Sequence, residues 1–402
     1  MIIKPVIIHP MDLLGNKIGG PETFIRNFIK YAPHDFEMEF VGVTCDKKNR
    51  PMGKWQIITA YKKNIRFLPI LYVRDENVRT KIPLSLKFTL ALFRYKKQVS
   101  SNNKILIYHR IEPSLPLANV PGKKVGFIHN NTMDMLHSAH TEVKWRYFPR
   151  LYFQMEKKLI SRMDKVFVVI EDMVQFYQRR YPFMANRFSF LPTWVDEETF
   201  YPYKNGVKAR HKSTFFKSQR FPADAKLILF VGRLEGQKDP LLLIDTFYYI
   251  NRHIPETRLL IVGKGALRKK MENRIEQYGL KERVVFLGIL PQDKVANLMK
   301  ISEIFLLTSE SEGMPRSVLE ALGCGLPVVC TDVGEVRRVV RDEFSGLICS
   351  KRNPKAIGDA VLKILKDSKF TVENCLSSIQ DYTARRVLNK VYNFYCDLGT
   401  KQ

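Results

Sequence analysis

The chain has 402 residues, 45% of them hydrophobic and 26% charged, which predicts two or three globular domains and argues against extended disorder. A net charge of +26 is unevenly spread: residues 51–165 hold 22 Lys and Arg against 7 Asp and Glu, a net of +15, which predicts an anionic partner. No apolar run reaches the ~18 residues of a membrane-spanning helix, the start is too short for a secretory signal, and six scattered cysteines without metal spacing favour a reduced, cytoplasmic protein.

The N-terminal half is predicted to alternate strands with helices. We expect strands at 6–9, 36–43, 55–59, 105–109, 125–129 and 166–170. This alternation is typical of a parallel sheet covered by helices, in which ligands bind beyond the carboxyl ends of the strands. His109 and His129 follow two of these strands and are therefore candidate site residues, although a lone histidine is more often a satisfied polar residue.

Two glycines, Gly19 and Gly20, lie between the first strand and an amphipathic helix that contains Phe24 and Phe28. Glycines let the backbone approach a ligand closely, and the helix start could face a phosphate. A Gly-Gly pair by itself is usually only a turn, and this one is not a G-x-G-x-x-G dinucleotide fingerprint.

Two basic segments, 82–97 and 145–165, mix Leu, Phe, Tyr and Ile with Lys and Arg as an interfacial helix does. The alternative for each is a core-packing helix with a solvated basic face. Together with the regional charge they predict peripheral contact with an anionic membrane. Nucleic acid is not expected as a partner, because the chain has no RNP, KH or zinc-finger pattern.

The domain boundaries follow from changes in pattern. Residues 1–200 are predicted to form one Rossmann-like domain, and an amphipathic helix is expected in 382–402. Residues 201–222 are polar, basic and without period, which predicts an interdomain linker. A second alternating unit, 223–381, begins with a strand and a loop that carries Arg233 and Lys238, and continues through Gly263.

The most informative stretch is 304–340. It predicts a strand, a polar loop through Gly313, a helix opened by Pro315, and a second strand. The amides of Met314, Arg316, Ser317 and Val318 would then be unpaired at a helix start, which favours a phosphate.

Two carboxylates bracket this helix start. Glu312 precedes it, and Glu320 lies among Val318, Leu319, Ala321 and Leu322, where a carboxylate is costly to bury without hydrogen-bond donors. A hydroxyl-rich ligand would supply those donors. The alternative is a pair of capping boxes, because Ser309 to Glu312 and Ser317 to Glu320 both fit S-x-x-E.

The whole stretch, with its E-x7-E spacing, resembles the donor-site signature of family 4 retaining glycosyltransferases (glycosyl transferases group 1). The resemblance implies the α/β GT-B fold, in which two Rossmann-like domains with doubly wound parallel sheets face a central cleft. It also implies that the helix in 382–402 returns to the first domain. It implies that Glu312 meets hydroxyls of the transferred sugar and that Glu320 holds the ribose. Backbone amides from Gly313 to Val318 would bind the diphosphate.

The resemblance extends to other positions. Arg233 and Lys238 match the pair that neutralises the donor pyrophosphate, and Gly19-Gly20 resembles the glycine loop that closes over it. His129 stands where the family commonly has an active-site histidine, which leaves His109 and Arg110 as weaker acceptor-side candidates. Two positions depart from the family pattern: Thr193-Trp194 replaces the usual Asn-Gly, and Lys264 replaces a common acidic residue.

The implied activity is retaining transfer of a hexose-type sugar from a nucleotide-diphospho-sugar to a saccharide or lipid-linked acceptor, in cell-surface polysaccharide or glycolipid synthesis. No cofactor or metal is expected, because the chain has no D-x-D and the cationic residues would take the place of a metal. The expected location is the cytoplasm, with peripheral contact at the cytoplasmic face of the membrane. The alternatives are a basic RNA- or polyanion-binding protein and a GT-B relative with other chemistry, such as nucleotide-sugar epimerisation.

Overall fold

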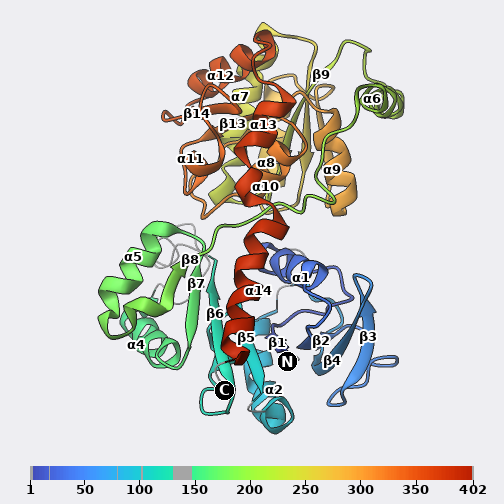
Figure 1. Cartoon of the computed structure of the whole chain (residues 1–402). Coiled ribbons are helices and arrows are strands. Elements are labelled where there is room, and N and C mark those ends of the chain that lie inside the picture. The colour runs from blue at the N-terminus through green and yellow to red at the C-terminus, as the bar shows by residue number, and fades with distance from the viewer. Residues whose placement is uncertain (1–2, 18, 79, 101–102, 130–146, 401–402) are drawn as a thin grey trace. The chain divides into compact units, whose positions relative to one another are not determined.

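Two sheets form the framework of the chain, and each belongs to a separate unit (Figure 1). The computed structural model describes residues 3–400 except 18, 79, 101–102 and 130–146. Contacts divide the chain into Met1–Pro192 with Ala384–Gln402, and Thr193–Thr383. Strands alternate with helices in both units, which confirms the predicted α/β class with two parallel-sheet domains.

Among the described residues, the first unit has an eight-stranded sheet in the order β3-β4-β2-β1-β5-β6-β7-β8. Neighbouring strands are parallel except for the antiparallel pair β3 and β4. In chain order the elements are β1 (Lys4–Ile8), α1 (Gly20–Tyr31), β2 (Glu39–Thr44), β3 (Gln56–Ala60), β4 (Lys63–Tyr72), α2 (Leu84–Val99), β5 (Lys104–Tyr108), η1 (Glu112–Ser114), β6 (Lys123–Ile128), α4 (Pro149–Ile160), β7 (Lys165–Val168), α5 (Glu171–Arg180), η3 (Pro182–Arg187), β8 (Phe188–Phe190) and α14 (Ala384–Thr400).

The hairpin of β3 and β4 was not expected from the sequence, which predicted β3 alone. Its turn places Tyr61 and Lys62 at φ values of 53° and 61°, in the left-handed region. A two-residue hairpin turn of this kind is usually made by Asn-Gly or Asp-Gly. Tyr-Lys therefore carries no turn signal, and the pairing with the neighbouring strand holds the turn in this conformation.

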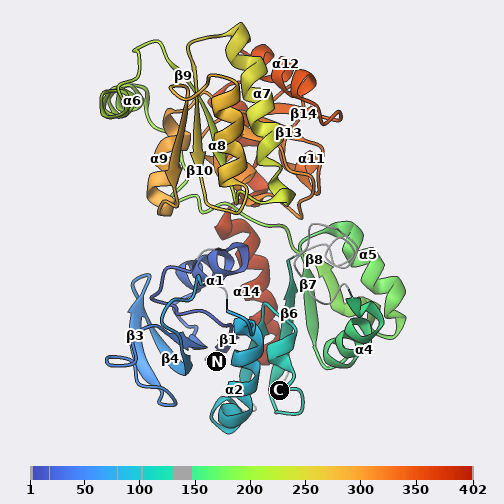
Figure 2. The same cartoon turned by 180° about the vertical axis from the view of Figure 1, so that it is seen from behind.

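Helix α14 packs within the first unit although it follows the second in sequence, and it lies alongside α1 in both views (Figures 1 and 2). The hydroxyl of Tyr392 donates to the backbone oxygen of Phe28 at 2.7 Å, and the two rings are 5.1 Å apart. Leu388 and Val391 are fully buried. These contacts make α14 part of the first hydrophobic core.

The second unit has a six-stranded sheet, all of whose residues are described, in the order β11-β10-β9-β12-β13-β14. All of its neighbouring strands are parallel. In chain order the elements are α6 (Asn205–Gln219), β9 (Lys226–Val231), η4 (Gly236–Lys238), α7 (Pro240–His253), β10 (Thr257–Val262), α8 (Arg268–Gln277), β11 (Val284–Gly288), α9 (Gln292–Ile301), β12 (Ile304–Leu307), α10 (Arg316–Gly323), β13 (Val328–Thr331), α11 (Val336–Val339), β14 (Gly346–Cys349), α12 (Pro354–Lys366), α13 (Val372–Ser378) and η5 (Gln380–Tyr382).

Two apolar clusters cover the two faces of this sheet. One contains residues of α7, α8 and α12, and the other contains residues of α9, α10 and α11. The strand order reverses between β9 and β12, because the chain builds outward from β9 first on one side and then on the other. Ligands of such sheets bind where the carboxyl ends of the strands diverge at this reversal.

The predicted linker, 201–222, contains a helix instead. Helix α6 spans most of this segment. Its Phe216 is buried in the apolar cluster that contains residues of α9, α10 and α11. Lys212 pairs with Glu303, and the hydroxyl of Tyr203 donates to Asn297 at 2.7 Å. The sequence shows no helical period here because α6 has no apolar stripe. A few aromatic side chains and polar contacts attach it to the rest of the second unit.

Residues 193–200, assigned to the first domain by sequence, have their contacts in the second unit. Val195 pairs with Thr383 in an isolated parallel bridge, and Trp194 is buried. No helix in the described part of the chain has the length and apolarity needed to cross a bilayer.

Truncating Leu388 to alanine should lower the free energy of unfolding of the first unit by about 2–5 kcal/mol, because it removes a fully buried side chain from α14. Denaturant unfolding followed by circular dichroism measures the loss. Lys390→Ala, on the exposed side of the same helix, is the matched control. Equal stability of the two variants would show that α14 is not integral to this core.

Candidate functional site

Three predicted donor-site residues meet at the strand reversal of the second unit. Arg233 and Lys238 follow β9, and Glu312 follows the neighbouring strand β12. Lys238 forms an ion pair with Glu312, and both side chains are largely shielded from solvent. Arg233 is exposed and donates to Gln237 at 3.1 Å. The sheet therefore brings together cationic groups and a carboxylate that are more than 70 residues apart in sequence.

Hydrogen bonds hold the two loops against each other. The side-chain amide of Gln237 donates to the backbone oxygen of Ser311 at 3.0 Å, and its backbone oxygen accepts from the Glu310 amide at 2.8 Å. The Thr308 hydroxyl lies 3.1 Å from the backbone oxygens of Lys238 and Asp239. These contacts fix the position of Lys238 relative to Glu312 before any ligand binds.

The capping-box alternative is wrong for Glu312. The Ser309 hydroxyl donates to the Glu312 carboxylate at 2.7 Å, so the two side chains bond to each other and not to backbone amides. With Ser309 and Lys238 on one oxygen, Glu312 is held as an oriented acceptor. An oriented carboxylate of this kind can accept hydrogen bonds from hydroxyl groups.

Helix α10 begins at Arg316, and Pro315 is the residue that precedes it rather than its first residue. Of the four amides expected to be unpaired, that of Val318 donates to the Pro315 oxygen at 3.1 Å, which corrects the prediction for this residue. The amides of Met314, Arg316 and Ser317 have no hydrogen-bond partner among the described residues. Three donors at a helix start form a suitable site for an anion.

Glu320 is only 8% exposed on α10, and no described residue donates a hydrogen bond to its carboxylate. Burial raises its pKa to about 7, with Arg316 opposing the shift and Asp196 adding to it. Asp196 is itself buried and accepts from the Thr199 hydroxyl at 2.8 Å. The position of Asp196 beside Glu320 was not expected from the sequence.

Gly263, another predicted donor-site residue, has a structural role in this fold. Its φ is 143°, and a Cβ there would lie 1.8 Å from the backbone oxygen of Gly232. Its amide donates to the Gly288 oxygen at 2.7 Å. Only glycine fits between these neighbouring strand ends, and its amide is already used within the sheet.

The predicted glycine loop follows β1 in the first unit. A Cβ on Gly20 would meet nothing within 4 Å, whereas one on Gly19 would lie 2.1 Å from the Glu22 carboxylate. Glu22 is buried in the first turn of α1, where it accepts from His9 at 3.1 Å and pairs with Lys17 at 3.4 Å. The Glu22 carboxylate thus lies at the start of α1, where the sequence analysis expected a phosphate.

The charges of this buried pair follow from burial and from their contact. Burial opposes charge on both groups and lowers the pKa of His9 to about 4, so this ring is neutral at pH 7. Burial is the largest effect on Glu22 and raises the pKa of its carboxyl, but the contacts with His9 and Lys17 together outweigh it and lower that pKa. Neutral His9 therefore donates through Nε2 to ionised Glu22.

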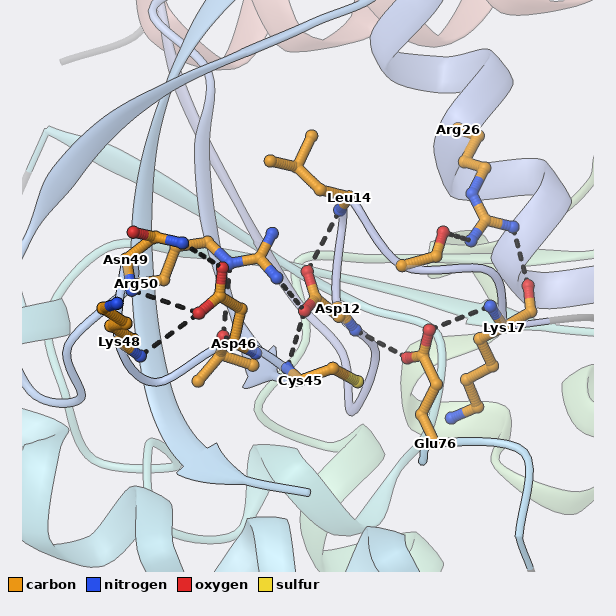
Figure 3. Close-up of polar contacts among 12 residues, drawn as sticks. Asp12, Leu14, Lys17, Arg26, Cys45, Asp46, Lys48, Asn49, Arg50 and Glu76 are labelled. Carbon is orange, nitrogen blue, oxygen red and sulfur yellow. Dashed lines mark hydrogen bonds and ion pairs between the residues drawn. The ribbon is translucent and has the colours of Figure 1, made fainter. Parts of the chain in front are cut away.

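A network of buried carboxylates anchors the loop that carries these glycines (Figure 3). Asp12 accepts from the backbone amides of Leu14 at 3.1 Å and Cys45 at 2.7 Å. It also pairs with Arg50 at 2.7 Å. Asp12 thereby joins the loop after β1 to the loop after β2.

Glu76 binds the same loop from the segment after β4 (Figure 3). Its two carboxylate oxygens accept from the backbone amides of Asp12 at 2.7 Å and Lys17 at 2.8 Å. Gly15 has no room for a side chain, because a Cβ would lie 2.2 Å from Glu76 Oε1. Burial raises the pKa of Glu76, and the two amide donors oppose that shift. No sequence pattern marked Glu76, because its partners are backbone atoms about 60 residues away.

The two candidate histidines are in direct contact. Nδ1 of His109 lies 2.9 Å from Nε2 of His129, and Phe24 of α1 packs against both rings. His109 is buried, which lowers its pKa well below the usual value, so its ring is neutral. Arg110 is exposed. Parallel pairing of β5 and β6 explains the contact, because it brings their carboxyl ends to one edge.

Comparison with known proteins finds a family match that lies within the second unit. Residues 211–376 match the family described as glycosyl transferases group 1. The second unit carries a glycosyl transferases group 1 domain. The match contains Arg233, Lys238, Glu312 and Glu320.

A curated relative in Escherichia coli, UDP-Gal:alpha-D-GlcNAc-diphosphoundecaprenol alpha-1,3-galactosyltransferase, is 29% identical over 218 residues, which are 53% of this chain and 54% of the relative. The chain thus matches about half the length of such relatives. Sucrose-phosphate synthase from Thermosynechococcus elongatus has a similar structure, with a TM-score of 0.79 at 19% identity, over 100% of both chains. The structure of HepE from Anabaena with UDP and glucose gives 0.72 at 14% identity, over 98% of this chain and 100% of HepE. These likenesses confirm the GT-B fold.

Replacing Glu320 by glutamine should remove a pH-dependent loss of stability. Because the pKa of this carboxyl is raised from 4.5 to about 7, the group stabilises the fold least above pH 7. Relative to Glu320→Gln, the unmodified chain should lose up to about 3 kcal/mol between pH 4.5 and 8. Urea unfolding at both pH values measures the difference, and parallel pH profiles would contradict it.

Replacing Glu76 by glutamine should loosen the loop after β1. One of the two backbone amides would face an N–H group instead of an oxygen, which costs about 1–3 kcal/mol. Hydrogen exchange at the amides of Asp12 and Lys17 should quicken, as mass spectrometry of this segment can show. Asp75→Asn, an exposed neighbour, is the control; unchanged exchange in Glu76→Gln would show that other contacts hold the loop.

Proposed function

We propose that this chain is a family 4 retaining glycosyltransferase, which transfers a hexose-type sugar from a nucleotide-diphospho-sugar to a saccharide or lipid-linked acceptor. The observation that carries the proposal is the meeting of Lys238, Glu312 and the unpaired amides before α10 at the strand reversal. It combines groups for a diphosphate with a carboxylate for sugar hydroxyls.

The leaving diphosphate gains negative charge as the bond from the anomeric carbon to its oxygen breaks. Lys238, Arg233 and the amides of Met314, Arg316 and Ser317 would stabilise that charge, so the proposed reaction needs no metal. The acceptor hydroxyl oxygen forms the new bond on the same face of the sugar, and its proton passes to the leaving phosphate. No carboxylate serves as a nucleophile in this scheme.

Two carboxylates and a histidine take the remaining roles. Glu312 accepts from sugar hydroxyls, and Glu320 accepts from ribose hydroxyls, which supply the donors that its buried carboxylate lacks. His129 is assigned to the sugar or the acceptor in the first unit, with His109 behind it. Gly20, with open space around it, is the position of the glycine loop that a ligand can approach.

The printed names of similar proteins support the substrate classes. The relative in Escherichia coli is named for transfer from UDP-Gal to a diphosphoundecaprenol-linked sugar, and HepE was solved with UDP and glucose. A place in cell-surface polysaccharide or glycolipid synthesis follows for this chain as part of the proposal. Six free cysteines fit a cytoplasmic location.

A thermal-shift screen against UDP, GDP, ADP and their sugar conjugates, without added metal, tests the donor site. One nucleotide should raise the melting temperature, by an amount equivalent to ~2.7 kcal/mol at 100 times its Kd. Lys238→Ala should remove the shift, and Lys269→Ala on α8 should keep it. No shift with any nucleotide would overturn the donor site and favour polyanion binding.

Lys238→Ala and Glu312→Ala should each lower turnover by about 100-fold or more while leaving the melting temperature close to that of the parent chain. A radiolabelled sugar donor and a panel of saccharide and lipid-linked acceptors provide the assay. Nuclear magnetic resonance of the product shows the anomeric configuration: inversion would refute the retaining assignment. Epimerised donor without transfer would indicate the alternative GT-B chemistry, and chelator-sensitive activity would refute metal independence.

A further inference from the structure

Helix α2 is apolar on two opposite sides, although only one of them faces the core. Phe88, Leu92 and Val99 are buried against the first unit. Leu86, Leu90 and Phe93 are 48%, 61% and 46% exposed. The second set recurs at intervals of four and three residues, so these side chains form one stripe along the outer side of the helix. We call Leu86, Leu90 and Phe93 the α2 stripe.

A single exposed leucine needs no explanation, but a row of three large apolar side chains on one helix does. Ile82, two residues before the helix, is 52% exposed and extends the apolar surface at its start. The buried side chains already secure α2 to the sheet, since Phe88 and Leu92 are fully buried. The α2 stripe is therefore not required for the packing of the first unit.

Basic side chains flank the α2 stripe. At about 100° per residue, Lys87 and Arg94 lie on one side of it and Lys96 on the other, with Lys97 in line with its end. Helix α2 contains no acidic residue, and it lies within the region of net charge +15. An apolar row with cations on both sides matches the layering of an anionic lipid surface, with acyl chains below and phosphates above.

We propose that α2 is the helix by which this protein docks on an anionic lipid bilayer, with the α2 stripe inserted among the acyl chains. Lys87, Arg94, Lys96 and Lys97 then bind the phosphates of the headgroups. The helix has 16 residues and four cations, so it lies in the interface and does not cross the bilayer. Docking is independent of sugar transfer, so its test requires no turnover.

The second basic segment, 145–165, has a different structure. Its helix α4 buries Tyr152, Leu159 and Ile160, and buried Glu156 accepts from the hydroxyls of Tyr177 at 3.1 Å and Tyr181 at 2.9 Å. These contacts pack one side of α4 against the core, while Phe148, just before the helix, and Leu151, in its first turn, are 62% and 55% exposed. Residues 145 and 146 lie outside the described residues, and the proposal therefore rests on α2 alone.

Vesicle co-flotation of the full chain tests the docking helix. Vesicles of phosphatidylglycerol mixed with phosphatidylcholine should bind the chain, and vesicles of phosphatidylcholine alone should bind it at least tenfold more weakly. Leu90→Gln/Phe93→Gln should lower binding to the anionic vesicles by about tenfold or more. Lys96→Glu/Lys97→Glu should do the same, and raising the salt concentration should weaken binding of the parent chain.

Ile289→Gln, which changes an apolar side chain of similar exposure (47%) in the second unit, is the matched control and should bind as the parent does. Melting temperatures check that every variant is folded. Equal vesicle binding by parent and Leu90→Gln/Phe93→Gln would overturn the proposal. So would self-association of the parent that this variant abolishes without vesicle binding, because the stripe would then join copies of the chain.

Discussion

The ion pair between Lys238 and Glu312 is the contact on which the candidate donor site depends. It forms because β9 and β12 are neighbours at the reversal of strand order, although 74 residues separate the two side chains. The same reversal places the start of α10 beside the pair, with three amides that have no partner in the described part of the chain. Cationic groups, amide donors and an oriented carboxylate thus share one edge of the sheet, an arrangement that suits the proposed stabilisation of charge on a diphosphate.

The first unit depends on buried carboxylates in a different way. Glu22, Asp12 and Glu76 are each nearly inaccessible to solvent, and each accepts hydrogen bonds from a ring, a guanidinium or backbone amides. Removing such an acceptor leaves buried donors unpaired, which is costly in a low-dielectric interior. These contacts attach the segment after β1, through residue 17, to the loops that follow β2 and β4.

The local patterns predicted much of the second unit. Strands, loops and the α10 start were expected near their observed positions, because a strand, a polar loop and a proline before an apolar period are signals within one short window. The helix α6 within the predicted linker was missed for the complementary reason: it has no apolar stripe, and Phe216 and the pair of Lys212 with Glu303 attach it through long-range contacts. The roles of Glu76 and Asp196 could not be predicted either, since their partners are distant in sequence.

The sequence by itself determined the fold class, the family match of the second unit and the residues that gather at its strand reversal, because these depend on local period and on an unbroken motif. Tertiary structure decided which groups are already occupied: the amides of Val318 and Gly263 are bonded within the fold, whereas the Glu320 carboxylate lacks a donor among the described residues. It also decided that Leu86, Leu90 and Phe93 face outward while Phe88 and Leu92 face the core. Both sides of α2 carry large apolar side chains, and packing against the sheet decides which of them are buried.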